Sequence, residues 1–244
     1  MKLPQAPLKE VIFEVFWDLE TGVDGLPIDK SFEFALGIFA SKIKHTHPII
    51  KKIIPNNLPF QLIGKTTHQF WRDEMTWPVV QLGSGVMAVN DTDKSYDWEN
   101  GYFNLIKDSL NFLFQSYENN IQTNYIQLRY IDAVDLPINV DYNDFLRENL
   151  RIELINHFDT LGTRTGFQIN QNFQLKDGSL ICLSVNDAVN DAHQQQSIIW
   201  TTTVLKRGSF SQNEIIEWLE YAHDYSSNMF KNMVSPQFYQ TFLW

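Results

Sequence analysis

The first clear pattern in the chain is an alternation of apolar and polar residues along Leu8–Trp17. One side of an extended chain would be apolar and the other mixed, with Val11, Phe13, Val15 and Trp17 set against Glu10, Ile12, Glu14 and Phe16. Alternation with a period of two is typical of a β-strand. We therefore predict a strand that is half buried or paired in a dimer.

Apolar residues spaced three or four apart predict two helices in the first half. One holds Phe32, Leu36, Phe39 and Ile43, begins at Asp29 or Ser31 and ends before Pro48. The other covers 98–117. Strands are predicted at 65–73, 76–82, 86–90 and 125–134, with Gly83-Ser84-Gly85 as a hairpin turn.

The second half repeats this order, with a short helical segment near 141–158 and strands at 165–175, 179–186 and 197–206. A long helix follows, because Ser211 and Glu214 have the spacing of a capping box. Met87–Asp91 resembles Leu183–Asp187, each at a strand end. We expect an α+β fold of two related halves, 1–138 and 139–244, packed as one globular unit. Each half would be a curved antiparallel sheet packed on a long helix.

Charge and composition narrow the partners. Lys and Arg total 19 against 29 Asp and Glu, a formal net charge of −10. This balance argues against nucleic acid, which binds basic surfaces, and is compatible with a protein partner. We expect no membrane span and no signal peptide, and hence a cytoplasmic protein. Cys182 is the single cysteine, so no intrachain disulfide can form, and its apolar neighbours predict a buried side chain.

Four residues are candidates for binding a ligand or partner. Arg129 should project from the strand face opposite Leu128 and Tyr130, where a guanidinium can hold a carboxylate or phosphate, or pair with a neighbouring strand residue. A ligand between sheet and long helix would meet Arg129 and Asn90. The remaining candidates are Asp132 and His223, the latter either an acid/base group or a histidine at a helix boundary.

A metal centre is an alternative built on three histidines. His45 and His47 could bind zinc or iron if His68 folded nearby as a third ligand. The pair lies in a helix-ending loop at an ordinary spacing, so we expect no metal and no cofactor. The sequence also has no P-loop lysine, no Gly-x-Ser-x-Gly elbow and no His-Glu-x-x-His motif.

Leu3–Glu14, Val80–Asn90 and Leu128–Asp132, together with Trp218, Ala222-His223 and Phe230, carry a family resemblance. These stretches resemble a sporadically distributed bacterial protein family of about this length that has no assigned activity. Asp132 stands where the family pattern has Asn, and the family offers no catalytic residues to carry over. Its scattered distribution implies a place in a bacterial defence or toxin–antitoxin module.

The leading hypothesis is therefore a non-catalytic interaction or regulatory protein that binds a protein partner and self-associates. Two alternatives stay open. One is a small-ligand-binding protein that uses a groove between sheet and helix, near Arg129 and Asn90. The other is a metal-dependent hydrolase at His45, His47 and His68.

Overall fold

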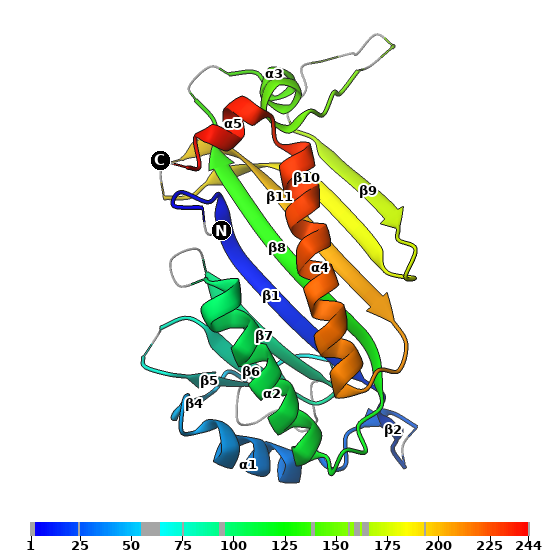
Figure 1. The fold of residues 1–244 in the computed structure, drawn as a ribbon. Helices are drawn as coiled ribbons and strands as arrows, with labels where there is room; N and C mark the ends of the chain where they lie inside the picture. Colours follow the sequence, from blue (N-terminus) through cyan, green and yellow to red (C-terminus); the bar gives the residue numbers. More distant parts are fainter. Residues whose placement is uncertain are drawn as a thin grey trace. The chain divides into compact units, whose positions relative to one another are not determined.

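The computed structural model describes residues 3–23, 25–54, 64–74, 76–92, 96–137, 140–155, 157–158, 162, 166–192 and 194–243 (Figure 1). Within these residues the fold is α+β. The strands are β1 (Leu8–Trp17), β2 (Glu20–Thr21), β3 (Pro27–Ile28), β4 (Ile49–Lys52), β5 (His68–Trp71), β6 (Val79–Gly83), β7 (Val86–Thr92), β8 (Thr123–Asp135), β9 (Gln168–Gln174), β10 (Leu180–Asn190) and β11 (Gln195–Arg207). The α-helices are α1 (Phe32–Ile43), α2 (Phe103–Ser116), α3 (Tyr142–Phe145), α4 (Gln212–Met233) and α5 (Pro236–Gln240), and η1 (Trp98–Tyr102) and η2 (Leu146–Leu150) are π-helical.

Nine of the described strands form one sheet in the order β4-β5-β6-β7-β1-β8-β11-β10-β9, and β2 pairs with β3. The chain divides into two compact units. Unit 1 holds residues 1–9, 129–204 and 222–244, and unit 2 holds 10–128 and 205–221. These units differ in extent from the expected halves 1–138 and 139–244, and the boundary expected between residues 138 and 139 lies outside the described residues.

Several predicted elements are confirmed at their expected positions. The first strand has the predicted bounds, and its buried positions alternate with half-buried ones as the pattern requires. The first helix covers Phe32–Ile43. The capping box at the start of α4 is also confirmed, because the Ser211 N–H and hydroxyl donate to Glu214 Oε2, each over 2.7 Å.

The helix predicted near 141–158 is wrong beyond Leu150. Helical structure there consists of α3 and η2, and Arg151 then takes a left-handed backbone conformation with φ of 55°. A residue with positive φ ends a right-handed helix. His157, also expected on a helix, lies in irregular chain, and the strand at Ile49–Lys52 was not predicted.

The predicted hairpin at Gly83-Ser84-Gly85 joins β6 to β7, and both glycines are required by geometry. Gly85 has a φ of +78°, which side-chain-bearing residues rarely adopt. A Cβ on Gly83 would stand 1.9 Å from the Lys65 carbonyl oxygen, which is closer than any contact allows. The turn therefore depends on glycine at both positions.

In unit 2, α1 and α2 cover one face of the sheet. The rings of Phe39 on α1 and Phe70 on β5 have centroids 5.2 Å apart. Register places Phe70 beside Val80, and Val80 beside Val89, which in turn faces Phe13. These side chains are all fully buried, so this face is the apolar core of unit 2.

The Tyr102 hydroxyl bridges β1 and β7 from the start of α2. It accepts a hydrogen bond of 2.9 Å from the Phe13 N–H and donates one of 2.6 Å to the Val89 carbonyl. Phe13 and Val89 are register partners, so the phenol links backbone groups that face each other across the two strands. The side chain is 1 % exposed, and burial raises the pKa of its hydroxyl well above the usual value. The hydroxyl therefore stays protonated.

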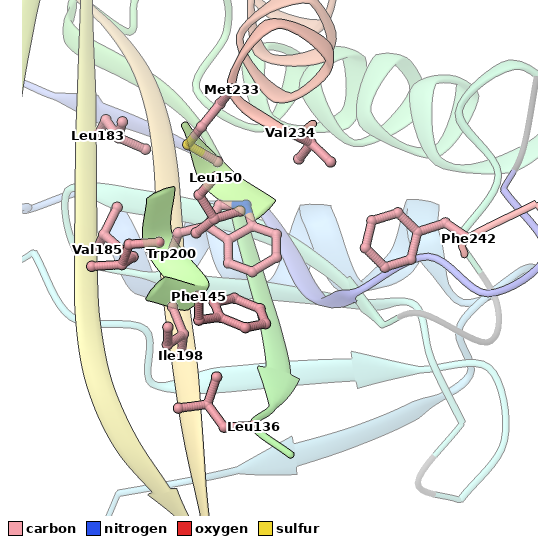
Figure 2. Packing of buried hydrophobic residues seen from close by; sticks show 11 residues of the cluster. Leu136, Phe145, Leu150, Leu183, Val185, Ile198, Trp200, Met233, Val234 and Phe242 are labelled. Carbon is pink, nitrogen blue, oxygen red and sulfur yellow. The ribbon is translucent and has the colours of Figure 1, made fainter. Parts of the chain in front are cut away.

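Unit 1 has its own core, with Trp200 at its centre (Figure 2). Leu183 and Val185 of β10 and Ile198 and Trp200 of β11 supply the strand side of this cluster, which is completed by Leu136, Phe145, Leu146, Leu150, Met233, Val234 and Phe242. Phe145 and Leu150 belong to the same cluster as Trp200. The short α3–η2 segment thus contributes packing although it is not a long helix.

In the described part of the chain, no helix combines the length and the apolar character that crossing a membrane requires.

Replacing Tyr102 by Phe removes the bridging hydroxyl and leaves a buried N–H and a buried C=O without this partner. We expect Tyr102→Phe to lower the free energy of unfolding by roughly 1–3 kcal/mol, the cost of an unsatisfied buried polar group. Urea denaturation followed by circular dichroism measures the change. The control is Tyr221→Phe, because Tyr221 is 62 % exposed. Equal effects of the two substitutions would contradict the bridging role.

Candidate functional site

A chain of side-chain hydrogen bonds crosses the unit 2 sheet on the face away from α1. The Trp71 indole donates to Gln69 Oε1 over 3.2 Å, and Gln69 Nε2 donates to Gln81 Oε1 over 3.2 Å. Gln81 Nε2 then donates to Asn90 Oδ1 over 2.9 Å, and Asn90 Nδ2 donates to Glu10 Oε1 over 2.7 Å. The chain spans β5, β6, β7 and β1, and we call this surface the polar face.

The two ends of this chain fix the orientation of every amide between them. An indole N–H can only donate, and an ionised carboxylate can only accept. Each amide of Gln69, Gln81 and Asn90 must therefore receive on its oxygen and donate from its nitrogen in one direction. Bonds aligned in this way polarise one another, and the last one is assisted by charge. Asn90 can consequently be 7 % exposed without an unsatisfied polar group.

A second, shorter chain follows the same rule on the same face. The Tyr125 hydroxyl donates to Gln127 Oε1 over 2.7 Å, and Gln127 Nε2 donates to Glu14 Oε2. Glu14 faces Ala88 across the β1–β7 ladder, and Ala88 faces Gln81, which places Glu14 on the polar face. Two carboxylates of β1 therefore each receive an amide hydrogen bond from a neighbouring strand.

A hollow of about 420 Å³ lies at the end of the second chain. Its lining includes Phe16, Asp18, Asn124, Tyr125 and Arg207, with Gly64 and Gly85 as small residues in the wall, alongside Trp17, Leu19 and Pro27. The Phe16 and Tyr125 rings have centroids 5.3 Å apart, and the Arg207 guanidinium lies 5.2 Å from the Tyr125 ring centroid. We call this site the Arg207 hollow.

The two charged residues of the Arg207 hollow, Asp18 and Arg207, have different interactions. Asp18 Oδ1 accepts a hydrogen bond of 2.6 Å from Asn124 Nδ2. Arg207 is exposed and forms no ion pair with the residues that the structure describes. A guanidinium stacked on an aromatic ring keeps its N–H edge available for a carboxylate or phosphate. The exposed guanidinium gives this hollow a group that can receive a carboxylate or phosphate.

A second hollow, of about 470 Å³, has the opposite electrostatic character, because Asp18, Glu20, Asp29 and Glu118 all line it. Asp29 is 6 % exposed, and its Oδ2 accepts from the Tyr117 hydroxyl over 2.6 Å and from the Trp17 indole over 3.3 Å. Burial and the hydrogen bond to Asp29 raise the pKa of Tyr117. These contacts fix Trp17, which borders both hollows, and the carboxylates make this second hollow unfavourable for an anion.

Asn90 and Arg129, predicted to flank one groove, belong to different units of the chain. Asn90 lies on the polar face, on the side of the unit 2 sheet away from α1. Arg129 belongs to unit 1 and is half buried. Strand alternation places it opposite Leu128 and Tyr130, as predicted, and another residue already interacts with it.

His223 lies on α4 in unit 1, with Nδ1 2.8 Å from the Tyr130 hydroxyl. Burial lowers the pKa of His223 to about 4, aided by Lys231 and opposed by Asp224. The ring is therefore neutral near pH 7 and hydrogen-bonded to a tyrosine.

Asp132, on the same side of β8 as Tyr130, is 7 % exposed. Burial raises the pKa of Asp132 to about 7, against the opposing effects of Lys9 and the Trp200 indole N–H. The Trp200 indole nitrogen makes no hydrogen bond to the described residues. This carboxyl group is thus buried in unit 1 with little compensation for its charge.

The three histidines of the metal alternative do not gather. His45 is exposed in the turn after α1, and His47 is buried with Nδ1 3.0 Å from the Thr46 hydroxyl oxygen. Burial, together with Arg72, lowers the pKa of His47 to about 4. His68 packs against Phe32, with ring centroids 6.2 Å apart. Within the described residues no three His, Cys, Asp or Glu side chains are arranged to hold a metal ion.

Sequence reasoning missed most of the polar face and the Arg207 hollow. The missed residues are Glu10, Glu14, Gln69, Gln81, Tyr125, Gln127 and Arg207. Polar residues recur on the less apolar side of the predicted strands, as Glu10 and Glu14 do in β1, and this pattern could have identified them. Strand order and register decide which of these residues meet.

Comparison with protein-family models, with curated proteins and with solved structures finds no match for this chain. The structural class of the chain is therefore defined by its fold and its candidate site. The chain is an α+β protein with a nine-stranded sheet, and unit 2 carries two polarised side-chain networks beside a hollow with an exposed guanidinium.

The raised pKa of Asp132 predicts how stability depends on pH. The folded chain keeps this proton up to about pH 7, whereas a carboxyl with the usual pKa of 3.8 releases it earlier. Stability from this group is complete below about pH 4 and is lost as the pH rises through 7. Asp132→Asn cannot ionise, so its stability relative to wild type should rise between pH 4 and 7, by at most about 1.4 kcal/mol per pH unit.

Urea unfolding of both proteins at intervals of pH tests this expectation. His47 and His223 are present in both proteins, so their opposite dependence on pH cancels in the difference. A stability difference that stays constant from pH 4 to 7 would show that Asp132 titrates normally.

Proposed function

We propose that the protein acts by binding rather than by catalysis, and that the Arg207 hollow takes a small ligand with an anionic group. The observation that carries this proposal is the Arg207 guanidinium, which stacks on Tyr125 at the hollow and has no ion-pair partner among the described residues. Small-ligand binding was one of the alternatives that the sequence left open, in a groove between sheet and helix. The ligand site proposed here is instead the Arg207 hollow.

The shorter hydrogen-bond chain supports this proposal because it holds Tyr125, which lines the hollow, in place. Arg207 lies over the Tyr125 ring, and the Tyr125 hydroxyl is hydrogen-bonded to Gln127, which in turn donates to the Glu14 carboxylate. A side chain already fixed by hydrogen bonds loses little conformational freedom when a ligand binds. A volume of about 420 Å³ is within the range of small-molecule sites.

Arg207→Gln should weaken anion binding because it removes the charge and keeps a polar side chain. The probes are inorganic phosphate and benzoate, which separate a phosphate ligand from an aromatic carboxylate. We expect the dissociation constant of the bound probe to rise about tenfold at low ionic strength, since Arg207 is exposed and solvent screens it. Isothermal titration calorimetry gives the constants, and amide NMR shifts at Gly85 and Asn124 locate the binding.

The matched control is Arg147→Gln, because Arg147 is a surface residue of unit 1 and its loss changes the net charge equally. It should leave probe binding unchanged. The proposal is abandoned if wild type binds neither probe at millimolar concentration, or if Arg207→Gln binds as well as wild type.

A second candidate is a cytoplasmic interaction or regulatory protein of a bacterial defence or toxin–antitoxin module, which the family resemblance suggests. The observation in its favour is exposed apolar surface in unit 1, where Ile155 is 63 % and Phe158 is 71 % exposed. Large exposed apolar side chains often mark a protein-binding surface.

Coexpression with the proteins encoded beside it tests this second candidate. A specific neighbour should co-purify at fixed stoichiometry by size-exclusion chromatography with light scattering, and Phe158→Ser should weaken that complex. Retention of the complex by this variant would exclude the surface, and a chain that binds none of its neighbours would exclude the candidate.

We also propose that the two halves arose by internal duplication, with bounds other than those expected. Chain order supports matching β1-α1-β5-β6-β7-α2 with β8-α3-β9-β10-β11-α4. The order β5-β6-β7-β1-β8-β11-β10-β9 is symmetric under that match. In this match β7 corresponds to β11. The resemblance of Met87–Asp91 to Leu183–Asp187 would instead make β7 correspond to β10. That short motif therefore does not support the duplication.

A further inference from the structure

Strand β9 stands at one end of the strand order, and within the described residues it pairs with β10 alone (Figure 1). Its residues are exposed on both sides of the strand, apart from the half-buried Ile169. Phe173 is 42 % exposed. An edge of this kind presents unpaired backbone groups to solvent and can template pairing with another strand.

The phase of the β9–β10 ladder determines which backbone groups face outward. The Asp187 N–H donates to the Phe167 carbonyl, and the Leu175 N–H donates to the Ser179 carbonyl, so odd-numbered residues bond toward β10. Hydrogen-bonded positions alternate along an antiparallel strand. The outward N–H and C=O groups are therefore those of the even-numbered residues Gln168, Asn170, Asn172 and Gln174.

The sequence of β9 is self-complementary in residue class. It reads Gln-Ile-Asn-Gln-Asn-Phe-Gln from residue 168 to 174. If an identical antiparallel strand is centred on Gln171, amides face amides and the two apolar residues face each other: Gln168 opposite Gln174, Ile169 opposite Phe173, Asn170 opposite Asn172, and Gln171 opposite its own copy. In this register the outward residues of both strands form the hydrogen-bonded pairs, as the ladder phase requires.

Charge singles out β9 as an edge where two copies can meet. The chain has a formal net charge of −10, so two copies repel unless their contact surface is neutral. Strand β9 holds no charged residue. Strand β4, at the other end of the sheet, is four residues long and carries Lys51 and Lys52, which discourage pairing.

We propose that β9 pairs antiparallel with the β9 of a second copy of this chain, about a two-fold axis that passes through Gln171. The pairing satisfies the outward backbone groups of the even-numbered residues and brings Ile169 of each copy against Phe173 of the other. A two-fold contact uses the same surface on both copies and closes after two chains. The proposal concerns unit 1 and does not depend on anion binding at Arg207.

Gln171→Glu tests the axis, because the two Gln171 side chains face each other and like charges directly opposite destabilise a strand pair. We expect wild type to be a dimer by sedimentation equilibrium and light scattering, and the variant to have a dissociation constant at least tenfold higher. Gln240→Glu adds the same charge at an exposed site on α5 and should leave the dimer intact. Circular dichroism must show that both variants fold.

Mixing Gln171→Glu with Gln171→Lys provides a rescue that misfolding cannot imitate. Opposite charges across the axis should restore a mixed dimer, whereas each variant alone stays largely monomeric. Monomeric wild type at all accessible concentrations overturns the proposal. A wild-type dimer that Gln171→Glu leaves unchanged also overturns it, since the contact must then lie elsewhere.

A cysteine on the axis reports the register directly. In a Cys182→Ser background, Gln171→Cys should form a disulfide-linked dimer under mild oxidation, because residues in a non-hydrogen-bonded pair have Cα atoms about 4.5 Å apart. Gln168→Cys is the control, since the two copies of residue 168 would lie about 20 Å apart along the strands. Equal cross-linking at both positions would exclude the proposed register. Anion binding measured on the Gln171→Glu monomer tests the Arg207 hollow separately.

Discussion

The polar face depends on the register of β1 against β7, and the Tyr102 hydroxyl holds that register. The phenol connects the Phe13 N–H to the Val89 carbonyl from a side chain at the start of α2. A shift of one residue would exchange the two faces of a strand and move Asn90 into the apolar core. Because Tyr102 can bridge only one pair of facing backbone groups, it fixes the strands and the helix together.

With this register in place, each amide network joins polar side chains of neighbouring strands in a defined order of donors and acceptors. Both networks start at a group that donates, the Trp71 indole or the Tyr125 hydroxyl, and both end on a carboxylate of β1. The direction of every bond follows from these ends, so the surface has one arrangement of donors and acceptors. Tyr125 links the shorter network to the Arg207 hollow, because its hydroxyl donates to Gln127 and its ring contacts the Arg207 guanidinium.

The local pattern of apolar and polar residues predicted those elements whose structure is determined by their own sequence. Strand β1 and the start of α4 agree with their alternation and capping box. It failed after Leu150, where the positive φ of Arg151 ends the helix and packing of short segments replaces helical periodicity. The candidate site was less predictable still. Asn90 could be named, but its partners Gln81 and Glu10 lie on other strands, and only the register brings them together.

The two ends of the nine-stranded sheet differ in a way that bears on assembly. A sheet that is open to pairing at both ends can add copies without limit, which is the route to fibres. Lysines on the short strand β4 oppose growth at one end, and the longer, uncharged β9 leaves only the other end open. Since a two-fold pairing uses that open end in both copies, it consumes the only edge in the described sheet that lacks charge. Under the proposed pairing assembly stops at two chains, and the formal net charge of −10 on each chain opposes the approach of further copies.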